Sequence, residues 1–307
     1  MSLSDRLPRI TVITPSLNQG EFIRQTVDSV VSQGYPELDY WIIDGGSSDG
    51  TLPILRSYQN ALRYISEPDA GQAEAVNKGL HRATGDVIGW LNSDDTYLPG
   101  ALETVGIFFR DHPDAAVLYG DAYYCDDDGK ILEPYPTRDF DWESFSSECY
   151  VCQPSLFFRR RVLEDVGLLN QALHFCMDYD FWIRVFRLHP PRRIRQFLSV
   201  SRMYSSNKTL SNRPAGLAET IRVVRHHYGR VPYKWAFAYA SHLRHGNDQY
   251  YDRRAPTVAD SLSALLWLGW FNRANPLYFI QCLAERFQAL RSVAAQPVKK
   301  QSINERS

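Results

Sequence analysis

Residues 90–95, WLNSDD, end an apolar run with two consecutive acids, Asp94 and Asp95. The run itself, DVIGWL at 86–91, is rich in the β-branched and aromatic side chains that favour a strand. An open parallel sheet binds its ligands beyond the carboxyl ends of its strands, where the loops diverge. Acids at this point therefore indicate a ligand site as well as the end of a strand.

The same kind of pattern extends along the chain on both sides of this strand. Short β-rich runs alternate with amphipathic helical stretches, which predicts a parallel sheet covered by helices. Strands are expected over residues 9–14, 39–44, 62–66, 86–91, 116–121 and 155–160, and helices over 21–33, 73–83, 99–110 and from about 178. Residues 122–200 are otherwise irregular in pattern, and from 214 onward the chain is mostly helical.

Polar segments follow three of the expected strands, at 14–18, at Asp44 and at 92–95. In a parallel sheet these segments meet in one crevice, where acids dominate. Adjacent carboxylates repel one another when buried, so Mg²⁺ or Mn²⁺, with phosphate oxygens completing its shell, is a natural way to keep them ionised. The acids alone do not decide the matter, because they are also consistent with a solvated turn that caps the next helix.

Composition excludes several classes of protein. A chain of 307 residues with 44% apolar and 13% aromatic residues can bury the core of one large domain or two. A net charge of -1 provides no positive field for nucleic acid. The N-terminal MSLSDRLPRI is charged where a secretory signal needs an apolar segment, and no uncharged apolar run reaches the ~20 residues of a membrane span. We therefore expect a cytoplasmic protein with no nucleic-acid partner.

Five cysteines, at 125, 149, 152, 176 and 282, are an odd number and fit a reducing compartment without disulfides. Cys149 and Cys152 form a single C-x-x-C, which is a weak signal for zinc. Reduced, buried thiols are the simpler interpretation.

Four segments in this order and spacing resemble the large family 2 type of inverting glycosyltransferases, which have the GT-A fold. They are ITVITPSLNQGEFIRQTVDSVVSQGYP (10–36), IIDGGSSDGT (42–51), SEPDAGQAEAVNKGLHRATGD (66–86) and WLNSDDTYLPG (90–100). Residues 152–185 are similar to the acceptor half of the same family, so the resemblance covers about 9–209. It implies an α/β fold with a Rossmann-like, nucleotide-binding mixed sheet flanked by helices.

The resemblance also implies a division of the chain. Residues 1–213 are expected to form the GT-A catalytic domain, with a donor-binding half over about 9–121 and an acceptor half over 122–213. A helical extension is expected over 214–295 and a disordered tail over 296–307.

The implied donor site consists of Thr14, Pro15, Asp44, Asp69, Lys78 and Ser93. Thr14 and Pro15 would line the nucleotide base, and Asp44 would accept a hydrogen bond from it. Asp69 and Lys78 match donor-site segments of the family. Taken by themselves, Asp44 is also consistent with a strand cap and Lys78 with a solvated helix residue.

Asp94 is the implied ligand of Mg²⁺ or Mn²⁺, and Asp95 is a second candidate. The chain departs from the common pattern of the family at Leu17, Gly45, Asn92 and Tyr204. Asn92 stands where many relatives have an acid, so we expect weaker metal binding, and Gly45 replaces a second acid that many relatives have beside Asp44. Leu17 replaces a common aromatic residue near the base. Some relatives have a metal-binding histidine at the place of Tyr204, to which we assign no ligand role.

Inversion requires a base that takes the proton of the acceptor hydroxyl while the nucleotide diphosphate leaves from the opposite face. The segment CMDYDFW, 176–182, aligns with the acidic motif that supplies this base in the family. Asp178 is the expected base and Asp180 the second choice, although an acid here also suits a helix cap. Gln153 and Pro154 are expected to border the acceptor pocket.

The C-terminal segment 261–287 concentrates Leu, Trp, Tyr and Phe, but polar residues interrupt it too often for a membrane span. Trp267, Trp270 and Phe271 suit a helix that lies in the plane of a membrane surface. Packing of these helices on the catalytic domain or in a homodimer is an equal alternative.

The sequence thus predicts a metal-dependent inverting glycosyltransferase of bacterial glycan or polysaccharide synthesis, peripheral to the inner face of the cell membrane. It would move a hexose from a nucleotide diphosphosugar, a UDP-sugar by preference, to a saccharide or lipid-linked acceptor. One alternative is a catalytically inactive sugar-nucleotide-binding or scaffold protein, which the missing acids at Asn92 and Gly45 would explain. Another is a nucleotidyltransferase, although PSLNQGEF (15–22) lacks the basic residue of a phosphate-binding loop.

Overall fold

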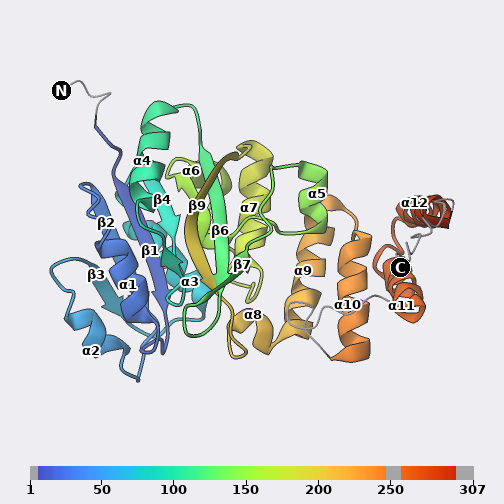
Figure 1. The fold of residues 1–307 in the computed structure, drawn as a ribbon, viewed down its shortest axis with the longest axis horizontal. Helices are drawn as coiled ribbons and strands as arrows, with labels where there is room; N and C mark the ends of the chain where they lie inside the picture. Colours follow the sequence, from blue (N-terminus) through green and yellow to red (C-terminus); the bar gives the residue numbers. More distant parts are fainter. Residues whose placement is uncertain (1–5, 247–256, 295–307) are drawn as a thin grey trace, which may run out of the picture. The chain divides into compact units, whose positions relative to one another are not determined.

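The computed structural model describes residues 6–246 and 257–294 (Figure 1). The chain divides into two compact units, Met1–Val223 and Val224–Ser307. The tail expected over 296–307 lies outside the described residues. The first unit contains the sheet and every residue of the predicted site.

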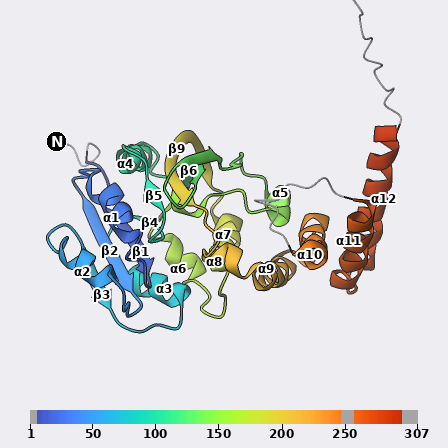
Figure 2. The same ribbon diagram turned by 60° about the horizontal axis from the view of Figure 1, so that its bottom comes forward.

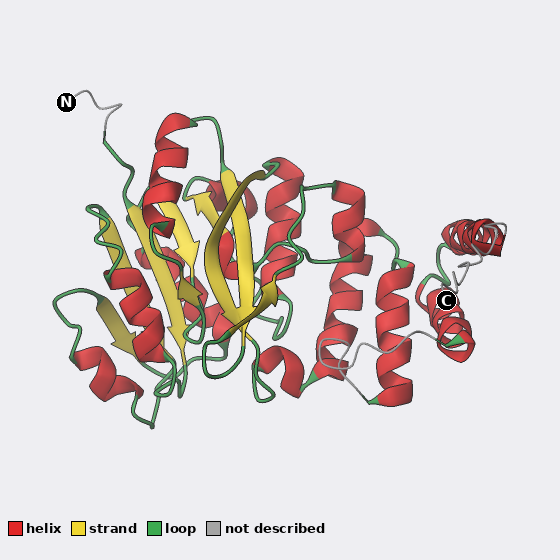
Figure 3. Ribbon diagram, viewed as in Figure 1, coloured by secondary structure: helices red, strands yellow, loops and turns green. Residues whose placement is uncertain are grey.

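A mixed sheet forms the centre of the first unit (Figure 3). Its strands are β1 (Ile10–Ser16), β2 (Leu38–Asp44), β3 (Arg63–Ser66), β4 (Val87–Trp90), β5 (Thr96–Tyr97), β6 (Val117–Cys125), β7 (Ile131–Pro134), β8 (Leu156–Arg159) and β9 (Arg192–Arg202). They follow the order β3-β2-β1-β4-β8-β6-β9-β5, with β7 paired to β6.

Parallel pairing joins β3, β2, β1 and β4, whereas β8 is antiparallel to both β4 and β6. Ser16 lies beside Asp44 in register, and Asp44 lies beside Ser66, so β1, β2 and β3 end at one edge. The predicted α/β class with a mixed sheet is therefore confirmed.

Helices cover both faces of this sheet (Figures 1 and 2). The helices up to this point of the chain, not all of which touch the sheet, are α1 (Ile23–Val31), α2 (Thr51–Arg56), α3 (Gln72–Arg82), α4 (Ala101–Asp111), α5 (Trp142–Ser147), α6 (Val162–Val166), α7 (Met177–Leu188), α8 (Lys208–Ser211) and α9 (Arg213–Tyr228), and a 3₁₀ turn spans Gln153–Ser155. The apolar stripes of α1 and α4 pack on one face, and α3 and α7 pack on the other. Gly79 permits the approach of α3 to β1, since a Cβ there would lie 2.4 Å from Ile13 Cγ2.

The irregular pattern of residues 122–200 hides more regular structure than the sequence predicts. It contains β7, α5 and the 11-residue strand β9. Arginines dominate the first half of β9 and pair with aspartates; the pairs are Arg192–Asp114, Arg193–Asp121 and Arg195–Asp139. The first half of this strand therefore shows no alternation of apolar and polar residues, because its side chains form ion pairs in place of apolar contacts.

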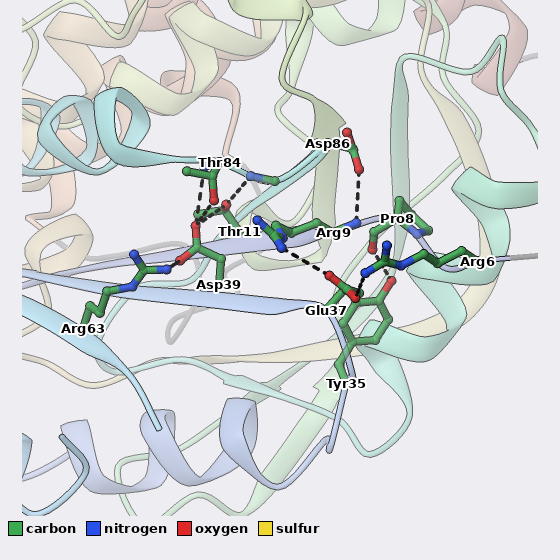
Figure 4. Close-up of polar contacts among 11 residues, drawn as sticks. Arg6, Pro8, Arg9, Thr11, Tyr35, Glu37, Asp39, Arg63, Thr84 and Asp86 are labelled. Carbon is green, nitrogen blue, oxygen red and sulfur yellow. Dashed lines mark hydrogen bonds and ion pairs between the residues drawn. The ribbon is translucent and has the colours of Figure 1, made fainter. Parts of the chain in front are cut away.

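A polar cluster joins the sheet near the amino ends of β1 and β2 (Figure 4). Asp39 is 3% exposed and accepts hydrogen bonds from Thr11 Oγ1 at 3.0 Å and Thr84 Oγ1 at 2.8 Å. Arg63 completes the set with an ion pair at 2.5 Å. The buried carboxylate therefore links β1, β2, β3 and the turn before β4 at the edge away from the predicted site.

Three further helices lie in the second unit: α10 (Tyr233–His245), α11 (Val258–Phe271) and α12 (Pro276–Ala294). Thr257 and Asp260 form a capping box at the start of α11. Trp267 and Phe271 pack against Tyr239, with ring centroids 4.9 and 5.5 Å away. These two residues therefore face other helices, unlike Trp270, which is 60% exposed. Within the described residues, we find no helix that is long and apolar enough to cross a membrane.

Candidate active site

A pocket of about 490 Å³ opens beyond the carboxyl ends of β1 and β4. The residues after β1 and β4 form part of its wall, and the start of α3, the start of α7 and the segment after β9 form the rest. Side chains that carry chemistry in this wall include Asp69, Asp94, Asp95, Gln153, Asp178, Tyr204 and Lys208. Of the strand-end segments expected to share one crevice, those after β1 and β4 line this pocket, whereas Asp44 at the end of β2 does not.

Asp94 and Asp95 lie next to each other in this wall, and their carboxylate oxygens accept hydrogen bonds from different donors. Asp94 Oδ2 accepts a hydrogen bond from the Tyr204 hydroxyl at 3.0 Å. Asp95 is 4% exposed, and its oxygens accept from the backbone N–H of Arg202 at 2.9 Å and from Asn92 Nδ2 at 3.3 Å. Burial raises the pKa of both carboxyls, and the charge of Asp94 raises the pKa of Asp95 further. Protein donors therefore occupy both oxygens of Asp95.

Asn92 connects this pair to the mouth of the pocket through a directed set of hydrogen bonds. Its Oδ1 accepts from Trp90 Nε1 at 2.9 Å and from Gln72 Nε2 at 2.8 Å. The Oε1 of Gln72 in turn accepts from Lys208 Nζ at 3.1 Å. Because each amide oxygen accepts, each amide nitrogen is left to donate, and that of Asn92 faces Asp95. The residue that replaces a common acid is thus suited to stand beside a buried carboxylate.

Arg202 also lines the pocket and supports the backbone beside Asp94, although no pattern in the sequence singled it out. Its side chain is 4% exposed and donates to the carbonyl of Asp94 at 3.0 Å and to that of Asp127 at 2.6 Å. It also donates to Gln25 Oε1 at 2.7 Å and lies over the Phe22 ring, 4.7 Å from its centroid. Position 202, at the end of a strand next to a motif segment, was the available signal.

The two candidates for the base lie in different surroundings. Asp178 lines the pocket, and its Oδ1 accepts from the backbone N–H of Tyr179 at 2.8 Å. Burial raises the pKa of Asp178 above the usual range of an aspartate. Asp180 lies outside the lining and forms an ion pair with Arg184 at 3.0 Å. Only Asp178 is therefore placed to act on a molecule in the pocket.

Three of the predicted donor-site residues line the pocket: Pro15, Asp69 and Ser93. Asp69 Oδ1 accepts from the backbone N–H of Gly71 at 2.9 Å, and burial raises the pKa of Asp69. A Cβ at Gly45 would lie 2.8 Å from Asp69 Oδ2. The missing acid at position 45 therefore leaves the space that the carboxylate of Asp69 takes.

The other three, Thr14, Asp44 and Lys78, lie outside the lining of this pocket. Thr14 is fully buried and shares a hydrogen bond of 3.2 Å with the Tyr40 hydroxyl. Asp44 accepts hydrogen bonds from neighbouring side chains and backbone, namely from Ser47 Oγ, Ser66 Oγ and the N–H groups of residues 46 and 47. Lys78 forms ion pairs of 3.1 Å with both Glu67 and Glu74.

Gln153 lines the pocket, whereas Pro154, its neighbour in the predicted acceptor site, does not. The side chain of Gln153 is fixed, because its Nε2 donates to the Trp90 carbonyl at 2.5 Å. Its Oε1 is buried and has no hydrogen-bond partner among the described residues. A ligand hydroxyl is a suitable donor for this oxygen.

The mixed sheet, its flanking helices and a pocket beyond the strand ends are the arrangement that the family resemblance implied. The sequence profile described as "Glycosyl transferase family 2" matches residues 11–167, about half of the chain, and the protein belongs to that family. The resemblance inferred from the motifs is therefore confirmed.

Curated relatives agree with this assignment. A Rickettsia felis protein called an uncharacterized glycosyltransferase is 26% identical over 222 residues, which are 67% of this chain and 36% of that protein. Escherichia coli chondroitin synthase is 25% identical over 75% of this chain and 34% of its own length. A Mycobacterium bovis PGL/p-HBAD biosynthesis glycosyltransferase is 29% identical, over 67% of this chain and 80% of its own. This chain thus spans about a third of the first two relatives.

Solved structures share the fold at low sequence identity. S. aureus TarS 1–349 in complex with UDP-GlcNAc superposes with a TM-score of 0.63 and 16% identity, over 89% of this chain and 83% of that one. The mannosyltransferase PcManGT of Pyrobaculum calidifontis, in complex with GDP-Man and Mn²⁺, gives a TM-score of 0.56 and 17% identity, over 96% of this chain and 78% of that one.

Arg202→Ala is expected to lower the free energy of unfolding by about 3 kcal/mol, since it removes the donor to buried carbonyl groups beside the site. Urea denaturation followed by tryptophan fluorescence measures the change. Arg195→Ala is the matched control, because that side chain is 79% exposed on the same strand. Equal loss of stability in the two variants would contradict the supporting role of Arg202.

Proposed function

We propose that the protein is an inverting, metal-dependent hexosyltransferase that moves a hexose from a UDP-sugar to a saccharide or lipid-linked acceptor in bacterial glycan synthesis. The observation that carries this proposal is that Asp94, after β4, and Asp178, on α7, line the same pocket. Asp94 can hold a cation at the diphosphate of the donor, and Asp178 can accept the proton of the acceptor hydroxyl. The relatives that synthesise chondroitin or act in PGL/p-HBAD biosynthesis support the glycan assignment.

A nucleotide sugar is the proposed donor, because the superposed TarS structure contains UDP-GlcNAc and the PcManGT structure contains GDP-Man. Pro15, Asp69 and Ser93 are proposed to contact it directly, since they line the pocket. Thr14, Asp44 and Lys78 would then act from behind the wall by holding its loops. Gln153 would accept a hydrogen bond from a sugar hydroxyl.

The acids of the pocket fit a hard divalent cation such as Mg²⁺ or Mn²⁺, and Asp94 is the residue proposed to hold it. Asp95 is the weaker candidate, because donors from the protein occupy both of its oxygens. In the described part of the chain, no group of three or more His, Cys, Asp or Glu side chains could hold a metal by itself. Phosphate oxygens of the donor would therefore complete the shell. A bound cation supplies stabilisation of the charge that develops on the leaving diphosphate.

Asp178 is proposed to take the proton of the acceptor hydroxyl as its oxygen attacks the anomeric carbon. Burial raises the pKa of Asp178, which makes the carboxylate a stronger base than an exposed aspartate. The reaction inverts the anomeric configuration because attack and departure occur on opposite faces.

Asp178→Asn is expected to reduce kcat for sugar transfer at least about 100-fold, because it removes the proton acceptor and preserves the shape of the side chain. Transfer from UDP-sugars to an acceptor panel, with binding of UDP measured by calorimetry, tests this. Asp180→Asn is expected to retain transfer, because Asp180 lies outside the pocket lining. Loss of transfer in a folded Asp180→Asn variant, with activity kept in Asp178→Asn, would exchange their roles.

Binding of Mn²⁺ together with UDP is expected to strengthen, by up to about 10-fold per pH unit, as the pH rises toward the raised pKa of Asp94. The reason is competition, since a carboxyl with a raised pKa retains its proton below that pKa and must lose it to bind metal. Isothermal titration calorimetry at several pH values measures the slope. Asp94→Asn is expected to abolish the gain in UDP affinity that Mn²⁺ provides. If the wild-type pH dependence of this gain persists in the variant, Asp94 is not the metal ligand.

We also propose that the second unit contacts the lipid surface on the cytoplasmic side of the membrane. Val258, Leu262, Leu266 and Trp270 form one row on α11 and are 59–78% exposed. Asp260 is the single charged residue in the sequence of α11, and it is buried against Arg244 and His245.

Charge at the end of this row favours lipid over a second copy of the chain. The Arg273 guanidinium lies over the Trp270 ring, 4.7 Å from its centroid, where it suits an anionic headgroup. Free thiols at all five cysteines, each within the described part of the chain, support the cytoplasmic side.

The double variant Leu262→Glu/Leu266→Glu is expected to lose flotation with phosphatidylglycerol-containing vesicles, because two charges in the row oppose insertion. Leu132→Glu, which alters a 51% exposed leucine of the first unit, is the matched control and is expected to float. Light scattering in solution should give a monomer for every variant. A wild-type protein that stays unbound, or a dimer that the double variant dissociates, would contradict contact with lipid.

A further inference from the structure

Glu219 is a buried carboxylate on α9 that binds the backbone just before the proposed base. It is 3% exposed. Its Oε1 accepts from the N–H of His174 at 3.0 Å, of Phe175 at 2.6 Å and of Cys176 at 2.9 Å. Three consecutive backbone donors therefore converge on one side-chain oxygen.

These donors lead directly into the pocket wall. Phe175, Met177 and Asp178 line the pocket, whereas Glu219 does not. Cys176 is the N-cap residue of α7, and among the described residues its own side chain provides no cap for the helix. Glu219 supplies a negative charge at this helix start from another helix, where the dipole of α7 favours it. The conformation of 174–176 thus depends on a residue about forty positions away along the chain.

The charge of Glu219 acts on Asp178 as well. Burial alone would raise the pKa of Glu219, but the hydrogen bonds from 174–176 outweigh it and lower the pKa, so the group is ionised at neutral pH. After burial, which is the largest cause, this charge contributes to the raised pKa of Asp178, and the Lys208 ammonium opposes it. The other titratable groups that interact with Asp178 are the thiols of Cys149, Cys152 and Cys176.

We propose that Glu219 is the positioning residue of Asp178: it holds residues 174–176 in the conformation that brings Asp178 to the pocket, and it places a fixed negative charge beside it. This inference rests on the proposed function, in which Asp178 is the base. It adds a residue that touches neither substrate and that lies outside the segments resembling the family.

Two variants separate the geometric effect from the effect of charge. Glu219→Ala removes the acceptor, so kcat should fall about 10- to 100-fold while the dissociation constant of UDP with Mn²⁺ changes less than about twofold. Glu219→Gln keeps an oxygen that can accept all three N–H bonds but removes the charge. Its kcat at high pH should remain within a few-fold of wild type, and the acidic limb of the kcat profile should shift to lower pH, because Asp178 then ionises more readily.

Kinetics and UDP calorimetry on the full chain, with Glu164→Ala as an exposed control of the same charge, test the proposal. An unchanged kcat and pH profile in both Glu219 variants would overturn it. So would an equal loss of UDP binding and kcat in Glu219→Gln, since that describes general unfolding of the pocket. If Glu219→Ala does not fold, the profile of Glu219→Gln decides alone. Failure of the proposed function is distinguishable, because the wild-type protein would then transfer no sugar or Asp178→Asn would remain active.

Discussion

The close placement of two carboxylates just after β4, with Asp95 buried and Asp94 half-buried, is the constraint on which the rest of the site depends. Asp94 and Asp95 repel one another, and a desolvated charge is costly unless donors face it. These donors are the Tyr204 hydroxyl, the backbone of Arg202 and the amide of Asn92. Two of these three donors come from β9 and the segment after it. The hydrogen bonds to Asp94 and Asp95 therefore hold the end of β9 close to the segment after β4.

Much of the fold followed from local pattern. The strands that surround the site are buried, short and bounded by turn residues, which is why 90–95 could be placed at a carboxyl edge together with Asp44 and the segment after β1. The contrast between Asp178 and Asp180 was only partly predictable. The two acids are two residues apart at the start of one helix, and this spacing does not say which carboxylate pairs with an arginine and which faces the pocket. Arg184 decides that choice, and only tertiary packing places it.

Long-range contacts account for what the sequence pattern missed. The first half of β9 lacks apolar alternation because its arginines pair with acids on the neighbouring strand β6 and on distant loops. Arg202 and Glu219 read as ordinary charged residues until their partners are known. Asn92 illustrates this: by the family pattern it only removes an acid from the proposed metal site, whereas in the fold its amide supplies the N–H that faces a buried carboxylate. An acid at this position would oppose Asp95 across the same hydrogen bond.

The position of Glu219 also fixes where the catalytic part of the chain can be cut. The motifs end near residue 209, and a boundary at 213 would retain every residue of the pocket lining. The compact unit nevertheless continues to Val223. A recombinant fragment that stops at 213 would carry the complete wall and still lack the acceptor for three backbone N–H groups at the start of α7. The shortest useful expression fragment is therefore longer than the segment that defines the family.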